Sequence, residues 1–254
     1  MSLSKCLEIL LKYSSSFLLG VRTTLIVSIT GTIIGFLIGL CVGGFRAVRP
    51  DKTADNTVRF IKHISDILAK IYIEVFRGTP MMVQAVFIYY LIYTNVFKWD
   101  KMFAAIFIIS INTGAYMSEI VRSGIQAVDA GQTEAARSLG LSSSQTMRFI
   151  VLPQAIRNAF PAIGNELIVN IKDSSVLMII SITELMFQSN SIAGTTYRFS
   201  ETYFVTAMIY LLLTSITSLV LHLIEKRLNN TRTSFPQSDT NFYSMSIASK
   251  GEDR

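Results

Sequence analysis

Long hydrophobic stretches separated by polar segments dominate this sequence. Runs with few or no charges occur at about residues 25–45, 79–97, 102–118 and 202–224. Each run approaches the roughly 20 residues that an α-helix needs to cross the hydrocarbon core of a bilayer. The pattern therefore predicts four membrane-spanning helices.

A fifth spanning helix is predicted at about residues 162–184, where the hydrophobic signal is weaker. Glu166, Lys172 and Asp173 interrupt this stretch, although residues 176–182 are strongly apolar. Ionisable side chains at membrane depth are costly unless they face protein or water. We therefore expect five spanning helices in an all-α fold, with this one turning its ionisable side chains toward the bundle interior.

Composition supports a membrane protein, because half of the 254 residues are hydrophobic and only 16% are charged. Most lysines and arginines lie within residues 46–77, 122–172 and 226–254, which alternate with the predicted spans. Cytoplasmic segments carry the excess of these residues. The N-terminus is therefore predicted to be outside and the C-terminus in the cytoplasm.

This topology divides the chain into three parts. Residues 1–16 form a short extracytoplasmic N-terminus, and residues 17–226 form the transmembrane domain. Residues 227–254 are mostly polar, so we expect a disordered cytoplasmic tail.

Other classes of function find little support in the sequence. The basic residues are scattered at helix ends beside acidic neighbours, so topology explains them better than nucleic-acid binding does. Cys6 and Cys41 lack the spacing of metal ligands. The two histidines, His63 and His222, are accompanied by no GxSxG or HExxH motif. We therefore predict no catalytic residue and no metal site.

The first spanning helix carries glycine at every fourth position, as Gly31, Gly35, Gly39 and Gly43. This spacing places the four residues on one stripe of the helix, where a partner backbone can approach closely. We expect a second helix to lie there. Packing within the bundle is favoured, and contact with another subunit is the alternative.

A mostly polar segment, EAARSLGLSSSQTMRFIVLP, lies between hydrophobic spans at Glu134–Pro153. Good helix formers occupy its first part, and Gly140 permits a left-handed turn that would end a first helix. Ser142 and the two serines after it offer capping oxygens to a second helix. The segment therefore predicts a helix, a glycine turn and another helix.

This hairpin suits a docking element. Ala135 and Ala136 leave room for a partner surface, and Glu134 can pair with Arg137 or accept hydrogen bonds across an interface. The alternative is a hairpin that lies on the membrane surface without a partner.

The same residues resemble a known family. Glu134, Ala135, Ala136, Gly140, Ile150, Leu152 and Pro153 match without a gap the EAA loop of permease subunits of binding-protein-dependent ABC importers. FRGTPMMVQ at residues 76–84, the run from Gly114 to residue 132 and NELIVNIKDSSV at residues 165–176 look like the polar amino acid permeases of that family. The resemblance covers roughly residues 15–226 and implies the type I ABC importer permease architecture.

The resemblance also implies partners and a coupling role. The EAA loop, at about residues 126–158, would dock on a cytoplasmic ATPase through Glu134, Ala135, Ala136, Arg137 and Gly140. The chain has no GxxxxGK[ST] motif, so ATP and Mg²⁺ belong to that separate ATPase, and this chain binds no cofactor. The expected assembly contains two ATPase subunits, a second permease subunit, identical or homologous, and an extracytoplasmic solute-binding protein.

The substrate pathway is predicted near the bilayer midplane. At 1.5 Å per residue, Asn112, Lys172 and Asp173 all fall at that depth of their helices. Lys172 and Asp173 would complement the carboxylate and ammonium of an amino acid, and Asn112 or Ser174 would add neutral hydrogen bonds. The alternative is that Lys172 and Asp173 pair with each other or with other helices.

We therefore predict a multi-pass permease in a bacterial inner membrane, surrounded by lipid, that imports a polar amino acid by alternating access. It would be a transport subunit and not an enzyme. The alternative is an ATP-independent channel or facilitator for small solutes, although such a protein has no use for an ATPase-docking loop.

Overall fold

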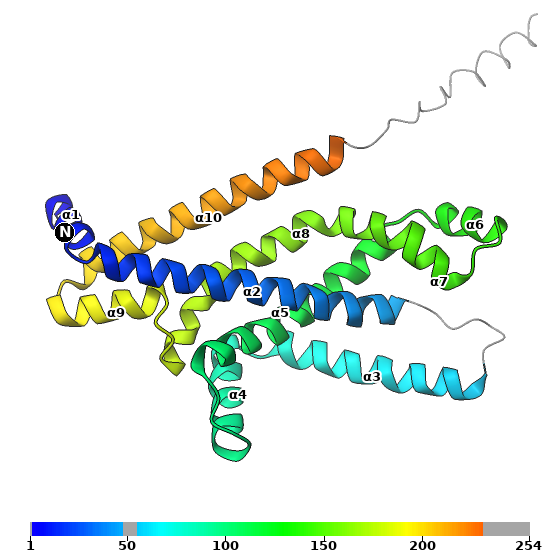
Figure 1. The fold of residues 1–254 in the computed structure, drawn as a ribbon, viewed down its shortest axis with the longest axis horizontal. Helices are drawn as coiled ribbons and strands as arrows, with labels where there is room; N and C mark the ends of the chain where they lie inside the picture. The colour runs from blue at the N-terminus through cyan, green and yellow to red at the C-terminus, as the bar shows by residue number, and fades with distance from the viewer. Residues whose placement is uncertain (1, 48–54, 231–254) are drawn as a thin grey trace, which may run out of the picture.

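The computed structural model describes residues 2–47 and 55–230, and every regular element in these two ranges is helical. The helices form an elongated bundle in which α2, α3, α8 and α10 run lengthwise and α4 points away from the others (Figure 1). The elements are α1 (Leu3–Lys12), α2 (Ser14–Ala47), α3 (Asn56–Gly78), α4 (Met81–Asn95), α5 (Lys101–Gln126), α6 (Ala130–Ser138), α7 (Ser143–Thr146), the π-helix η1 (Met147–Val151), α8 (Leu152–Asp173), the 3₁₀-helix η2 (Ser174–Ile180), α9 (Leu185–Thr196) and α10 (Phe199–Asn230).

The glycine stripe of α2 packs against α5, which forms the most extensive helix pair of the described bundle. A β-carbon at Gly35 would lie 2.7 Å from the Cβ of Thr113, and one at Gly43 would lie 2.5 Å from the carbonyl oxygen of Ser118. Only glycine permits so close an approach of the two backbones. The predicted packing of this stripe within the bundle is confirmed.

A buried polar network ties α8 to the pair formed by α2 and α5. The side chain of Asn170 donates to Thr32 Oγ1 at 2.8 Å and to Thr113 Oγ1 at 3.0 Å, and Ser28 donates to the Asn170 carbonyl oxygen at 2.9 Å. A satisfied network of this kind fixes the register of three helices, because breaking it would leave buried polar groups without partners.

The described residues hold three to five candidate membrane spans. Helices α2, α5 and α10 are each long and apolar enough to cross a bilayer. The α3–α4 pair is bent by 114°, and the segment from α7 to η2 meets α9 at 56°. If each bent pair is one span, the total reaches the predicted five.

Two regions differ from the prediction. Residues 46–77 were expected to form a polar inner loop, yet α3 occupies Asn56–Gly78. The continuous helix predicted at residues 162–184 is wrong, because α8 ends at Asp173 and a 3₁₀-helix follows. Ser181 then adopts a left-handed conformation with φ of 62°, and α9 starts in a new direction at Leu185.

Two helices extend past the bounds that the sequence predicts for the transmembrane domain. Helix α2 begins at Ser14, within the segment assigned to the extracytoplasmic N-terminus, and α10 continues to Asn230. Residues 231–254 of the predicted tail lie outside the described residues.

Candidate functional site

Backbone hydrogen bonds cap the C-terminal end of α6, the first helix of the α6–α7 hairpin. Gly140 has a φ of 85°, a conformation that glycine adopts without steric cost. Its N–H donates to the Arg137 carbonyl oxygen at 3.0 Å, and the N–H of Leu141 donates to the Ala136 carbonyl oxygen at 3.2 Å. This pair of bonds is the Schellman motif, which satisfies the carbonyl groups left free at a helix end.

The second helix of the hairpin, α7, starts at Ser143, and Ser142 is its N-cap residue. The hydroxyl of Ser142 accepts from the Gln145 N–H at 3.3 Å, and the Gln145 side chain accepts from the Ser142 N–H at 2.9 Å. This reciprocal capping box fixes the start of α7. A π-helix and then Pro153, in the first turn of α8, connect α7 to the long α8 helix. The predicted helix, glycine turn and helix are confirmed.

Most of the predicted contact residues lie on the free surface of the hairpin. Glu134, Ala135, Arg137 and Gly140 are exposed, whereas Ala136 is only 5% exposed and faces the rest of the chain. Arg137 donates to the Ser143 hydroxyl at 3.1 Å, and no bond to Glu134 is present among the described contacts. Only one of the two alanines is therefore free to meet a partner.

Two of the four predicted pathway residues make internal hydrogen bonds. Asn112 is 8% exposed, and its side-chain nitrogen donates to Gln84 Oε1 at 2.8 Å. Gln84 in turn donates to the Phe76 and Thr79 carbonyl oxygens, so Asn112 braces the bend between α3 and α4. Ser174 is fully buried and donates to the Ile171 carbonyl oxygen at 2.9 Å.

The other two, Lys172 and Asp173, form the last turn of α8 at the point where the helix breaks. Lys172 is exposed and Asp173 is partly buried. Adjacent helical residues project in different directions, and the two side chains form no ion pair in the described structure. The four predicted residues therefore have different surroundings in the described structure, because Asn112 and Ser174 are buried, Lys172 is exposed and Asp173 is partly buried.

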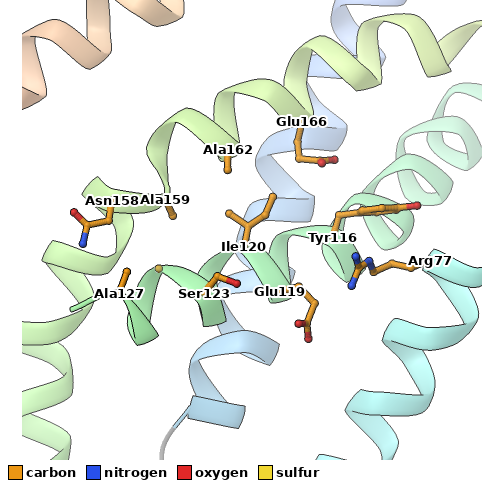
Figure 2. A pocket seen from close by; sticks show the side chains of 11 residues that line it. Arg77, Tyr116, Glu119, Ile120, Ser123, Ala127, Asn158, Ala159, Ala162 and Glu166 are labelled. Carbon is orange, nitrogen blue, oxygen red and sulfur yellow. The ribbon is translucent and has the colours of Figure 1, made fainter. Parts of the chain in front are cut away.

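A cavity of about 560 Å³ lies among α3, α5 and α8. Its charged lining residues are Arg77, Glu119 and Glu166. In Figure 2, Arg77 lies beside the ring of Tyr116, and Glu166 extends from α8 toward the same side. The guanidinium carbon of Arg77 is 5.4 Å from the centre of the Tyr116 ring, which is within the range of a cation–π interaction.

An ion cluster lies at one edge of this cavity. Arg46 of α2 donates to Glu119 Oε1 at 2.6 Å, and Arg122 donates to Glu119 Oε2 at 2.7 Å. Glu119 and Arg122 lie three residues apart on α5 and form an ion pair, and Arg46 adds a link between α2 and α5. A carboxylate between two guanidinium groups is strongly held, because both interactions are charge-assisted hydrogen bonds.

Sequence reasoning missed a buried carboxylate, that of Glu184. It is fully buried, and its oxygens accept from the N–H groups of Met186 and Phe187 at 2.7 Å each and from the Tyr210 hydroxyl at 3.1 Å. These bonds cap the start of α9 and join it to α10. The run Thr183–Glu184 before an apolar segment was the available signal of a new helix start.

Comparisons with known proteins identify the family. A family described as the inner membrane component of binding-protein-dependent transport systems matches residues 53–230. The glutamine transport system permease protein GlnP of Escherichia coli K12 is 36% identical over 211 residues, which cover 82% of this chain and 91% of that protein. The arginine transport system permease protein ArtQ of Bacillus subtilis 168 is 33% identical and covers 83% of this chain and 91% of its own length.

Solved structures give the same result. A chain of an amino acid ABC transporter crystallised with histidines is 38% identical, has a TM-score of 0.74, and matches over 86% of this chain and 96% of its own length. A chain of the MetNI methionine ABC transporter, at 20% identity and a TM-score of 0.70, shares the fold. This chain therefore belongs to the family of binding-protein-dependent transport system inner membrane components, and it is a multi-pass, non-catalytic part of such a transport system.

Proposed function

We propose that this chain is the permease subunit of an ATP-driven importer for a polar amino acid. The names of its relatives, which transport glutamine or arginine, support this substrate class. Family membership implies a separate binding protein and an ATPase. The proposed assembly contains two ATPase subunits and a second permease, identical or homologous, which completes the pathway.

The observation that carries this proposal is the capped α6–α7 hairpin. Its sequence matches the EAA loop, and its two helices are fixed by a Schellman motif and a capping box within residues 136–145. Because its two helices are fixed relative to each other, the hairpin would pass a movement of the ATPase on to the permease without deforming. Glu134, Ala135, Arg137 and Gly140 form the proposed ATPase contact, and Ala136 holds the hairpin on its own chain.

The proposed topology places the hairpin in the cytoplasm and the N-terminus outside. The excess of lysine and arginine near the hairpin supports this orientation. Figure 1 draws the hairpin at the end of the bundle opposite to α1 and α9, which supports the proposal that these elements lie on opposite sides of the membrane.

The proposed pathway runs along one face of α8. Glu166 lines the cavity and lies seven residues, or about two helical turns, before Asp173, so both carboxylates project from the same side. They would receive the ammonium group of an amino acid, while Arg77 or Lys172 would receive its carboxylate. Asn112 and Ser174 would shape the pathway by holding the bend before α4 and the break after α8.

Transport in this proposal is mechanical. ATP binding would bring the two ATPase subunits together, and each would carry one hairpin with it. Because η1 and α8 continue directly from the hairpin, its movement would reach the break at Asp173. A passive channel is the alternative function, and it would give uptake that persists without ATP.

Copurification tests the docking step. Glu134→Ala and Gly140→Val are expected to leave the permease folded and to reduce the amount of ATPase subunit that copurifies with it. Gly140 has open space around it, so a larger side chain there alters only the backbone conformation. Gly78→Ala is the matched control, because that position is also open and has no positive φ. Unchanged copurification of the hairpin variants would contradict the docking role.

A further inference from the structure

Helix α1 presents three distinct sectors around its axis. At 3.6 residues per turn, Cys6 and Ile9 project to one side, and both are nearly inaccessible, at 4% and 2% exposure. They pack in a cluster with residues of α2, α9 and α10, namely Phe17, Leu185, Ile192 and Val205. This first sector fastens α1 to the bundle.

The second sector is apolar and largely exposed. It adjoins the first sector and contains four leucines whose side chains remain 77%, 58%, 37% and 68% exposed, namely Leu3, Leu7, Leu10 and Leu11. Four contiguous leucines are far more apolar surface than an aqueous face of a helix normally carries.

The third sector is charged and consists of Lys5, Glu8 and Lys12. Arg198, in the turn between α9 and α10, donates to Glu8 Oε2 at 2.9 Å. Lys12 and Arg198 also line a cavity of about 330 Å³ between α1 and that turn. The charged sector therefore lies on the side of the polar turn, and the leucine sector lies away from it.

Helix α1 lies across the end of the bundle and does not run along its long axis. The backbone changes direction at Tyr13, which separates α1 from α2. Figure 1 shows α1 nearly end-on beside α10 while α2 runs across the view, so α1 crosses the bundle axis. Leu18 and Leu19, on the first turns of α2, are also exposed and add apolar surface close to α1 in the chain.

We propose that α1 is an interfacial lipid-binding helix. The leucine sector enters the acyl region of the leaflet, and Lys5 and Lys12 reach the lipid phosphates. The apolar surface on α2 and the charge of the lysines favour this occupant, because a helix with separate apolar and cationic faces binds at the membrane–water boundary. Assignment to the outer leaflet rests on the proposed topology, whereas the lipid contact itself does not.

Fluorescence quenching tests the proposal in the whole transporter, reconstituted in vesicles of phosphatidylcholine and phosphatidylglycerol. Leu7→Cys and Ser4→Cys are labelled with a small fluorophore in a Cys41→Ser background, in which Cys6 remains buried. Ser4 lies between the leucine and charged sectors on the same helix, so it is the matched control. Quenching is measured with lipids carrying a nitroxide near the top of the acyl chain, with aqueous iodide, and again after the solute-binding protein is added.

The proposal predicts that the lipid nitroxide quenches the label at position 7 several-fold more than the label at position 4, with the order reversed for iodide. The binding protein should leave position 7 unchanged. Lys5→Gln with Lys12→Gln should remove any increase in thermal stability that phosphatidylglycerol gives to the unsubstituted protein. Iodide quenching at position 7 that only the binding protein relieves would overturn the proposal, because the leucines would then form a protein-docking surface. Equal quenching at positions 4 and 7 would overturn it as well.

Discussion

Replacing Gly39 with alanine should loosen the contact between α2 and α5. A β-carbon at this position would lie 2.7 Å from the carbonyl carbon of Met117 and 2.8 Å from the amide nitrogen of Ser118. Both are backbone atoms, and Met117 is fully buried. No change of rotamer can relieve the overlap, so the two helices must move apart.

The size of the effect follows from two opposing contributions. Forcing extra atoms into a packed interior costs about 3 kcal/mol at the upper end of its usual range, which fits an overlap with backbone. Alanine recovers about 1 kcal/mol of helix propensity relative to glycine. The net loss is about 2 kcal/mol, or a fall of about 4–8 °C in Tm for a chain of this size.

Gly44→Ala provides the matched control on the same helix. No heavy atom lies within 4 Å of the β-carbon that it adds, so the variant keeps only the gain in propensity. Thermal unfolding of both purified variants, followed by the loss of a monodisperse chromatographic peak, measures the difference. Equal Tm values for Gly39→Ala and Gly44→Ala would refute the close packing of α2 on α5.

Three further predictions concern polar groups. Asp173→Asn should raise the KM for uptake several-fold with normal expression; lost expression with an unchanged KM would indicate a structural role. Glu184→Gln should cost about 1–3 kcal/mol of stability, because an amide cannot satisfy all three donors, and Tyr210→Phe should cost about 1 kcal/mol; unchanged Tm values would contradict the cap. The hydrogen bond and charge of Arg198 hold the pKa of Glu8 below its usual range. Stability from this pair is therefore present at neutral pH and is lost as acid protonates Glu8, so the unsubstituted protein and Arg198→Gln should differ in Tm at pH 7 and converge below about pH 4.

Features determined by local sequence could be predicted. The α6–α7 hairpin depends on residues close together in the chain, since Gly140 alone permits the left-handed turn and Ser142 caps the next helix. The glycine stripe could also be predicted, because residues spaced four apart lie on the same side of a helix. For the glycine stripe, the structure adds the identity of the partner helix, α5.

Features determined by tertiary contacts could not be predicted. Hydropathy averages over a window, so it hid the break after Asp173, where capping by Glu184 starts a new helix. Helix α3 was missed because some of its contacts with the bundle are polar, since Tyr72 donates to the Ile111 carbonyl oxygen and Lys62 lies over the ring of Phe45. Asn112 was assigned to the pathway by depth alone, yet its side chain bonds to Gln84.

ATP-dependent uptake tests the central claim most directly, that an ATPase drives this permease through the α6–α7 hairpin. The measurement follows a labelled amino acid into vesicles that contain the permease, its ATPase and the binding protein, with and without ATP. We predict uptake that requires ATP and is lost in Glu134→Ala and Gly140→Val but retained in Gly78→Ala. Uptake that continues without ATP, or equally in all three variants, would contradict the account.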